Sequence, residues 1–148
     1  MDTATDYSTG ESLSFCLALA RAYATLSRRF DGRLGSLHGL SFADFTMLLQ
    51  LRRAVGGRLR RVDLADALGL TPSAVTRALI PLEKIGLVSR QPDPRDARVG
   101  YATLTKAGQR VLDEAAESAD QLSRETISRG EVPELPALLK ALARLAEK

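Results

Sequence analysis

The side chains most able to recognise another molecule lie together in the middle of the chain. Ser73, Thr76 and Arg77 follow a Thr71-Pro72 pair at helical spacing. Serine and threonine hydroxyls and the arginine guanidinium form hydrogen bonds with base edges and with phosphates. Thr71 can cap a helix, and proline is favoured at the first helical position because it has no N–H to lose there. The pattern predicts a helix whose first turns present hydrogen-bonding groups to a nucleic acid.

The segment before Thr71 predicts a second helix, and the pair has the spacing of a helix-turn-helix. Ala65 is small enough to let the two helices approach closely, Gly69 permits a tight turn, and Val75 fills the core under the second helix. The core positions by spacing are Leu64, Leu68, Val75, Leu79 and Leu82, and the outward positions are Ser73, Thr76, Arg77, Ile80 and Lys84. The alternative interpretation is a helix pair packed inside an ordinary bundle.

The positive charge of the chain is concentrated in the same region. Residues 51–100 carry ten bases and five acids, a balance of +5, whereas residues 1–50 and 101–148 each have a balance of −1. A localised basic surface is what a nucleic-acid contact needs. Leu and Ala together make up 46 of the 148 residues and aromatic residues only 5%, which favours a mainly α-helical protein.

Hydrophobic spacing and capping residues predict six helices and one β-hairpin to position these side chains. The predicted helices are 13–34, 41–54, 61–68, 71–85, 105–128 and 135–145, and the strands are 87–90 and 101–104. The first helix frays from Gly32 onward, and the second begins with a capping box of Ser41 and Asp44. Pro81 falls inside the fourth helix, where we expect it to remove the hydrogen bond to the Arg77 carbonyl and to kink the helix.

Residues 64–108 resemble the winged helix-turn-helix regulators of the multiple-antibiotic-resistance regulator (MarR) family. The matching runs are Leu-Glu-Lys-Ile-Gly-Leu-Val at 82–88, Asp-Ala-Arg at 96–98 and Leu-Thr-Lys-Ala-Gly at 104–108. The resemblance implies a single, mainly α domain over 1–148 with a small β-hairpin as its wing. It implies a winged helix-turn-helix over 41–104 and a helical dimerisation region over 11–37 and 105–148. It further implies a homodimer that binds a palindromic operator in double-stranded DNA and regulates transcription, most often as a repressor.

The wing supplies a second set of expected DNA contacts. By resemblance, Arg98 enters the minor groove at the wing tip and is held by Asp96. Their spacing supports this pairing independently, because side chains two residues apart on an extended strand point the same way. The alternative for Arg90, Arg95 and Arg98 is a solvated loop. The residues expected to contact DNA are Arg61, Thr71, Ser73, Thr76, Arg77, Lys84, Arg90, Arg95, Asp96 and Arg98.

A small aromatic or phenolic effector is implied by the same resemblance. Many members of the family bind small aromatic acids in a cleft between the dimer helices and the winged domain. Here Arg21, His38, Phe42 and Phe45 could line such a cleft, with the guanidinium pairing a carboxylate. The effector would release DNA by favouring a dimer whose recognition helices are wrongly spaced for the operator. The alternative places Arg21 on a solvated face, His38 in a loop and both phenylalanines in the core.

Cys16 is a candidate sensor of oxidants. Its position, fourteen residues before Phe30, resembles the reactive cysteine of the organic-hydroperoxide-sensing branch of the family. In that branch tyrosine hydroxyls favour the reactive thiolate, whereas the matching positions here are Phe30 and Phe42, which have no hydroxyl. The alternative is that Cys16 is a small apolar residue in the dimer core.

The sequence contains few residues that could support another class of function. With one cysteine and one histidine we expect no internal disulfide, no metal site and no cofactor. No apolar run approaches the roughly 18–20 residues of a membrane helix, and the start of the chain, with Asp2, Asp6 and Glu11, does not resemble a signal peptide. We therefore expect a cytoplasmic protein without membrane contact. The alternatives to a DNA-binding regulator are an enzyme with Cys16 as nucleophile and His38 as base, and a winged-helix module that binds only proteins.

Overall fold

The computed structural model describes residues 10–96 and 98–147, which form six α-helices and a three-stranded sheet. The helices are α1 (Glu11–His38), α2 (Phe42–Arg53), α3 (Arg61–Leu68), α4 (Pro72–Lys84), α5 (Lys106–Arg129) and α6 (Leu135–Ala146), and the strands are β1 (Arg58–Arg60), β2 (Val88–Pro92) and β3 (Gly100–Leu104). Asp2 and Asp6 of the acidic start and Ala97 of the wing motif lie outside the described residues. None of the described helices has the length and apolar character of a membrane span.

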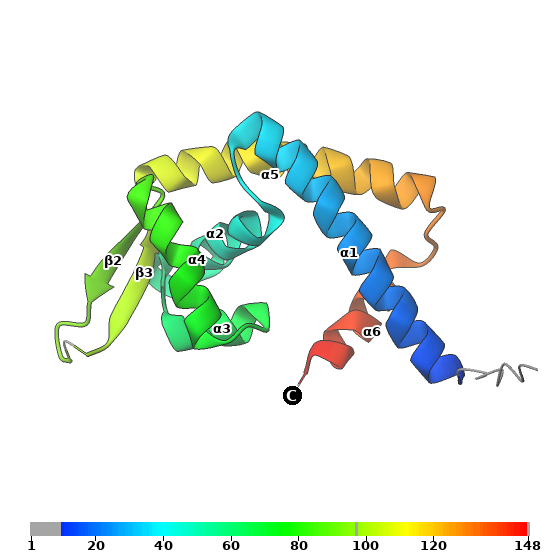
Figure 1. The fold of residues 1–148 in the computed structure, drawn as a ribbon, viewed down its shortest axis with the longest axis horizontal. Helices are drawn as coiled ribbons and strands as arrows, with labels where there is room; N and C mark the ends of the chain where they lie inside the picture. The colour runs from blue at the N-terminus through cyan, green and yellow to red at the C-terminus, as the bar shows by residue number, and fades with distance from the viewer. Residues whose placement is uncertain (1–9, 97, 148) are drawn as a thin grey trace, which may run out of the picture.

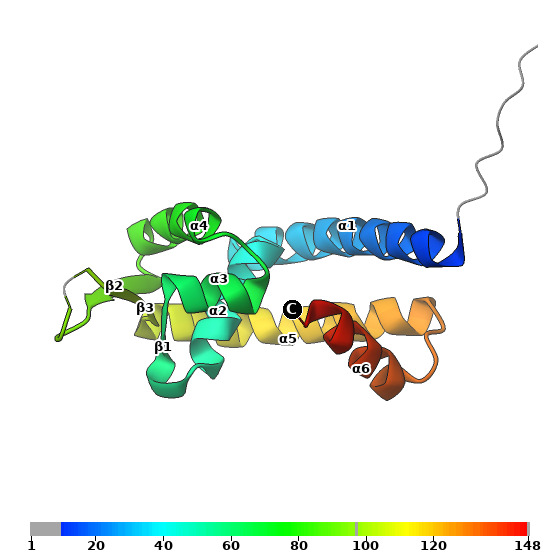
Figure 2. The ribbon, with the colours of Figure 1, turned by 90° about the horizontal axis from the view of Figure 1, so that it is seen from below.

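The two longest helices organise the molecule. Helix α1 crosses α5 and packs against it, while α2, α3, α4 and the sheet gather at the first end of α5 (Figure 1). Helix α6 folds back beneath the other end of α5, far from the hairpin of β2 and β3 (Figure 2). The Arg33–Glu125 ion pair, at 3.2 Å, joins α1 to α5, and the Arg52–Asp113 pair, at 2.5 Å, joins α2 to α5.

The hydrophobic core lies where the helix-turn-helix, the sheet and α5 meet. Its fully buried side chains come from α1, α2, α3, α4 and α5, and they include Leu34, Leu48, Leu51, Leu64, Val75 and Leu112. The predicted capping box is present: Ser41 Oγ accepts the Asp44 N–H, and Asp44 Oδ2 accepts the Ser41 N–H, each at 3.0 Å. The predicted bounds of α3 are confirmed, and all six predicted helices are present.

The first helix is longer than its sequence predicts. We expected fraying from Gly32, but α1 continues through Gly32 and Gly35 to His38. Of Gly32, Gly35 and Gly39, only Gly39 takes a left-handed conformation, with φ 68°, and it ends the helix. The reason is tertiary, because Leu34 is fully buried in the core and holds the last turns in place.

Strand β1 is absent from the sequence prediction. It has only three residues, and it is a strand because it pairs with β3, with Arg60 opposite Tyr101 in an antiparallel sheet of order β1-β3-β2. The hairpin also differs from its prediction. Pairing extends to Pro92 opposite Gly100, so β2 starts and ends later than predicted and the connecting loop is shorter than ten residues.

Candidate nucleic-acid interface

The helix-turn-helix is formed by α3 and α4. Gly69 ends α3 with φ 65°, a conformation that disfavours a side chain, and Thr71 begins α4 by accepting the Ala74 N–H on its hydroxyl at 3.2 Å. Leu64 and Val75 are fully buried between the helices, as predicted, and Leu68 is partly buried. Helix α4 remains helical through Pro81 to Lys84. These contacts fix which face of α4 is outward.

The outward face of α4 carries the side chains that its spacing predicts. Ser73, Arg77 and Lys84 are exposed. Thr76 is only half-buried, and its hydroxyl donates to the Pro72 carbonyl at 3.0 Å and accepts from Arg61 Nη1 at 3.2 Å. Arg61, at the start of α3, therefore reaches α4 and lies beside its outward face.

Arg98 is held at the wing as expected. Its side chain is 91% exposed, and its Nε and Nη2 donate to the Asp96 carboxylate at 3.0 and 3.2 Å. The backbone N–H of Arg98 donates to the same carboxylate at 3.0 Å. The guanidinium first and then the backbone N–H hold the pKa of Asp96 below its ordinary value. The pair presents a guanidinium whose direction is already restricted.

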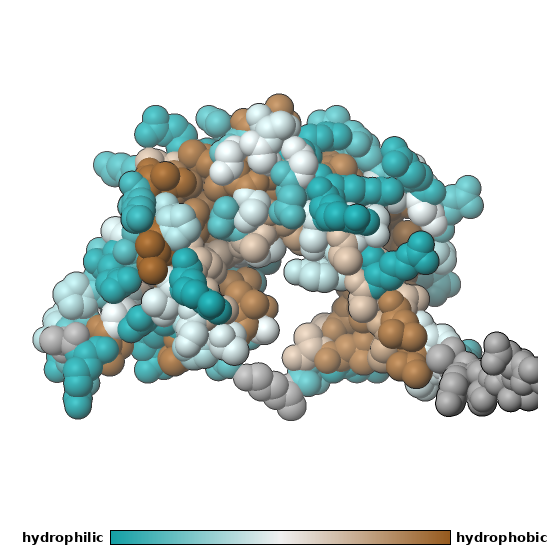
Figure 3. Space-filling view, viewed as in Figure 1, coloured by the Kyte–Doolittle hydropathy of each residue, from teal (hydrophilic) through white to brown (hydrophobic). Residues whose placement is uncertain are grey.

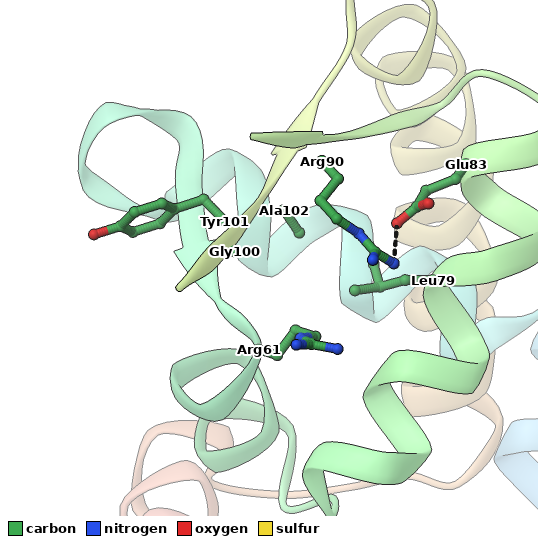
Figure 4. A pocket seen from close by; sticks show the side chains of 7 residues that line it. All are labelled: Arg61, Leu79, Glu83, Arg90, Gly100, Tyr101 and Ala102. Carbon is green, nitrogen blue, oxygen red and sulfur yellow. Dashed lines mark hydrogen bonds and ion pairs between the residues drawn. The ribbon is translucent and has the colours of Figure 1, made fainter. Parts of the chain in front are cut away.

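The other two predicted arginines of the hairpin have different surroundings. Arg90 reaches from β2 toward α4, where its Nη2 donates to Glu83 at 3.3 Å (Figure 4). Arg95 is exposed, and its backbone N–H donates to Asp93 at 2.7 Å. The sequence prediction puts Arg90 at the end of a strand and Arg95 and Arg98 in the loop after it. In the structure Arg90 lies within β2 and joins the wing to α4, whereas Arg95 and Arg98 belong to the loop.

Strand β1 adds two arginines that the sequence prediction omits. The guanidinium carbon of Arg58 lies 4.5 Å from the centre of the Tyr101 ring. Arg60 Nε donates to Asp63 at 2.7 Å, and this hydrogen bond raises the pKa of Arg60 above its ordinary value. Arg60, Arg61 and Arg98 line a shared hollow of about 170 Å³. The run Arg-Leu-Arg-Arg at 58–61 was the signal that could have identified them.

The four side chains predicted to line an effector cleft are not brought together. Arg21 and His38 are seventeen residues apart on α1, roughly 25 Å along the helix. His38 is the last residue of α1 rather than part of a loop, and its Nε2 lies 2.8 Å from Ser118 Oγ. Phe42 stacks on Phe30 with the ring centres 4.4 Å apart, and Phe45 is 8% exposed in the core.

Arg21 instead lies at a separate hollow between α1 and the end of α5. This hollow of about 530 Å³ has apolar walls that include Ala18, Ala22, Leu26, Ile127 and Val132. Arg29 and Arg129 also line it, so three arginines and several apolar side chains share this hollow.

Cys16 is exposed on α1 rather than buried within the chain. It lines a hollow of about 550 Å³ with Phe15, Leu19, Ala20, Tyr23 and Leu145. Phe30 lies fourteen residues further along α1, about 21 Å along the helix, and Phe42 stacks on it. Among the residues that line this hollow, Tyr23 is the one that carries a hydroxyl.

Comparison with known proteins identifies the architecture. The family model described as MarR family matches residues 40–99, from the start of α2 to the wing. The transcriptional regulator BldR from Sulfolobus solfataricus is 33% identical, and the match covers 91% of this chain and 94% of that one with a TM-score of 0.83. This chain belongs to the MarR family. It is therefore a DNA-binding transcriptional regulator.

Two further structures of relatives bear on its surfaces. Sco3205, a MarR-family regulator from Streptomyces coelicolor solved in complex with DNA, is 28% identical with a TM-score of 0.81, over 93% of this chain and 89% of that one. NadR, solved in complex with 4-hydroxyphenylacetate, is 26% identical with a TM-score of 0.73, over 99% of each chain. Two curated helix-turn-helix regulators of Bacillus subtilis also match this chain. The match covers 64% of the length of one of them and 97% of the length of the other. BldR, Sco3205 and these curated relatives are named as transcriptional regulators, and none of them is named as an enzyme.

Proposed function

We propose that this protein is a homodimeric repressor that binds a palindromic operator and is released from it by a small aromatic or phenolic acid. The observation that carries the DNA-binding part is the guanidinium of Arg98, exposed at the wing tip and oriented by Asp96. An exposed, restricted arginine suits insertion into the minor groove, where enhanced negative potential attracts it. The DNA contacts we propose are those on the outward face of α4 and the wing, with Arg61 beside them.

The experiment that tests this assignment is operator binding by an Arg98→Ala variant. Fluorescence anisotropy with a labelled duplex from the region upstream of the gene for this chain measures the affinity. We expect the variant to bind about tenfold more weakly, because one good base contact is worth roughly 1–3 kcal/mol. Arg110→Ala, which removes the same charge from an exposed site on α5, is the control and should bind normally.

Two results would contradict the assignment. If Arg98→Ala binds the operator with unchanged affinity, the proposed contact of the wing with DNA is contradicted. Phosphate contacts release counterions, so the affinity of the natural chain for DNA should fall as the salt concentration rises. An affinity that does not fall would argue against DNA binding altogether. Failure to bind any duplex would instead support a winged-helix module for protein partners.

The proposed dimer uses residues 11–37 and 105–148, which leaves 41–104 as the DNA-binding region. Helix α6 is the main support, because none of its residues is buried although it carries five leucines. Those leucines are between 39% and 65% exposed. Apolar surface gathers over α6 and the neighbouring start of α1 (Figure 3). An amphipathic helix that is not buried against the rest of the described residues needs another surface to cover its apolar face.

The proposed effector site is the hollow that contains Arg21. A hollow lined by arginine and apolar side chains suits an aromatic carboxylate, and NadR was solved with such a molecule. Because its walls belong to α1 and α5, the helices of the proposed dimer region, occupancy would be coupled to dimer geometry. Adding 4-hydroxyphenylacetate to the complex should lower its anisotropy, and Arg21→Gln should raise the required concentration. A complex that stays intact at millimolar concentrations would exclude this class of effector.

A second candidate function is oxidant sensing through Cys16, and one observation favours it. The thiol is exposed in a hollow that also holds the phenol ring of Tyr23. Attack of the thiolate on an organic hydroperoxide would give a sulfenic acid and the corresponding alcohol. Treatment with cumene hydroperoxide should then release DNA, a thiol should restore binding, and Cys16→Ser should abolish the response. Tight binding that survives the treatment would make Cys16 structural.

A further inference from the structure

The outer face of the sheet holds a cluster that lies away from the recognition helix. Arg58, Asp93, Pro94, Arg95 and Tyr101 line a hollow of about 350 Å³ there. Figure 4 shows Tyr101 pointing to the opposite side of β3 from Leu79 and Arg90. Apart from Arg95, which belongs to the wing, the proposed function uses none of these residues.

The ring of Tyr101 is fixed against strand β1. The register places Arg60 directly opposite Tyr101, so Arg58, two residues earlier, is its diagonal neighbour on the same face. The Arg58 guanidinium carbon lies 4.5 Å from the ring centre, within the range of a cation–π contact. Because β1 leads directly into α3, this contact connects the hairpin to the helix-turn-helix.

The hydroxyl of Tyr101 reaches the base of the wing loop. It donates to Asp93 Oδ2 at 3.1 Å, while Asp93 Oδ1 accepts the backbone N–H of Arg95 at 2.7 Å. The Asp93 N–H donates to the Val99 carbonyl at 2.9 Å, across the loop. The Arg95 N–H first, and the Tyr101 hydroxyl in addition, lower the pKa of Asp93 below its ordinary value. Asp93 thus closes the loop with its backbone N–H and joins it to Tyr101 with its carboxylate.

The remaining contacts continue from this base to the wing tip. The Val99 N–H donates to the Asp96 carbonyl at 3.0 Å, and the Asp96 carboxylate holds the side chain and backbone of Arg98. A continuous series of contacts therefore runs from Arg58 through Tyr101 and Asp93 to Arg98.

We propose that Tyr101 is a positioning residue for DNA binding, whose hydroxyl, through Asp93, holds the wing loop in the geometry that presents Arg98. This inference rests on the proposed wing contact and adds a residue that touches no DNA. An arginine at a hairpin tip loses conformational freedom when it binds, and a loop that is already ordered reduces that loss. Removing the hydroxyl should therefore weaken binding while leaving the guanidinium itself unchanged.

The test is a double-mutant cycle on operator binding. Tyr101→Phe keeps the ring and its contact with Arg58 and deletes only the hydroxyl. We expect its affinity for the upstream duplex to fall about three- to tenfold, the size expected for the net loss of one typical hydrogen bond. In an Arg98→Ala background the same change should have no further effect, because Tyr101 acts through Arg98.

Thr103→Val is the matched control. Thr103 lies two residues from Tyr101 on the same face of β3, and within the described part of the chain its buried hydroxyl has no hydrogen-bond partner. The control deletes a hydroxyl from the same strand and should bind DNA normally. Amide hydrogen exchange at Arg95 gives a second readout, which should become faster in Tyr101→Phe and stay unchanged in Thr103→Val.

The outcomes separate this inference from the function on which it rests. Normal binding by Tyr101→Phe, or an equal loss in both backgrounds, would overturn the positioning role while leaving the wing contact intact. Normal binding by Arg98→Ala would contradict the wing contact, and the positioning role would fall with it. If Tyr101→Phe folds poorly, Asp93→Ala removes the acceptor of the Tyr101 hydroxyl together with that of the Arg95 N–H. Its loss of affinity should likewise be absent in the Arg98→Ala background, and an equal loss in both backgrounds would overturn the positioning role.

Discussion

Arg98 and Arg90 each have one carboxylate partner, and the location of that partner determines what the ion pair does. Asp96 lies on the same loop as Arg98, so their pair orients a side chain without linking elements. Glu83 lies on α4, so its pair with Arg90 fixes the hairpin relative to the recognition helix. Exposed ion pairs contribute little to stability, which makes orientation the main consequence of both.

Gly108, in the first turn of α5, occupies a position that has no room for a side chain. A Cβ added there would lie 2.1 Å from the Leu87 carbonyl oxygen and 2.8 Å from a Leu104 methyl carbon. We expect Gly108→Ala to lower the free energy of unfolding by about 1–3 kcal/mol, because backbone must move to admit the methyl group. Urea denaturation followed by circular dichroism measures this change.

Gly32→Ala is the control for that experiment. Gly32 also lies inside a helix, and a Cβ there would meet nothing within 4 Å. Alanine should be neutral or stabilising by about 0.5–1 kcal/mol at this position, because it restricts the unfolded chain and favours helix. Similar stability in the two variants would show that α5 does not depend on close approach to Leu87.

Helix α4 contains two prolines in different structural positions. Pro72 is at the first helical position, where no hydrogen bond is lost and the fixed φ suits the helix. Pro81 is exposed within the helix, where it has no N–H to donate to the Arg77 carbonyl. The bonds that precede Pro81 and the burial of Leu79 and Leu82 keep the element helical on both sides of it.

We expect Pro81→Ala to raise the free energy of unfolding by about 1 kcal/mol or more, since alanine restores the missing backbone donor. Pro72→Ala serves as the matched control in the same helix and should be neutral or slightly destabilising. Thermal unfolding of both variants measures the difference. A loss of stability in Pro81→Ala would indicate that the proline ring contributes packing that the backbone bond does not replace.

At the scale of the whole molecule, α5 links the two surfaces that the proposed function must couple. Its 24 residues extend about 36 Å. Its first turn lies against Leu87, just before the start of β2. Its middle pairs with α2 and α1, through Asp113 and Ser118. Its last turn lines the hollow that contains Arg21. A shift of α1 against the end of α5 would therefore be transmitted to the winged region.

The proposed dimer can be tested on α6. Leu139 is 65% exposed on its apolar face, and a charge there should disfavour a buried interface. In sedimentation velocity, we expect the natural chain to be a dimer and Leu139→Glu to be a monomer with weaker operator binding. Val55→Glu changes an apolar side chain that is 97% exposed outside this surface and should remain dimeric. A monomeric natural chain, or a dimeric Leu139→Glu, would exclude α6 as the dimer contact.

The sequence by itself determined the elements whose signals are local. The bounds of α3, the Thr71 cap of α4, the Ser41–Asp44 capping box and the inward and outward positions of the recognition helix all follow from residues within one or two turns of each other. The Asp96–Arg98 pair was also predictable, because a spacing of two residues brings both groups to one side of an extended strand.

The tertiary structure alone decided the features that depend on distant partners. β1 has three residues and no periodicity of its own, and it exists because β3, more than forty residues later, supplies its hydrogen bonds. The last turns of α1 persist because the core buries Leu34, which outweighs the helix-weakening glycines nearby. Packing also decides the contacts of Tyr101, Arg90 and His38. The partners of these side chains lie in other elements, so no local sequence pattern specifies the contacts.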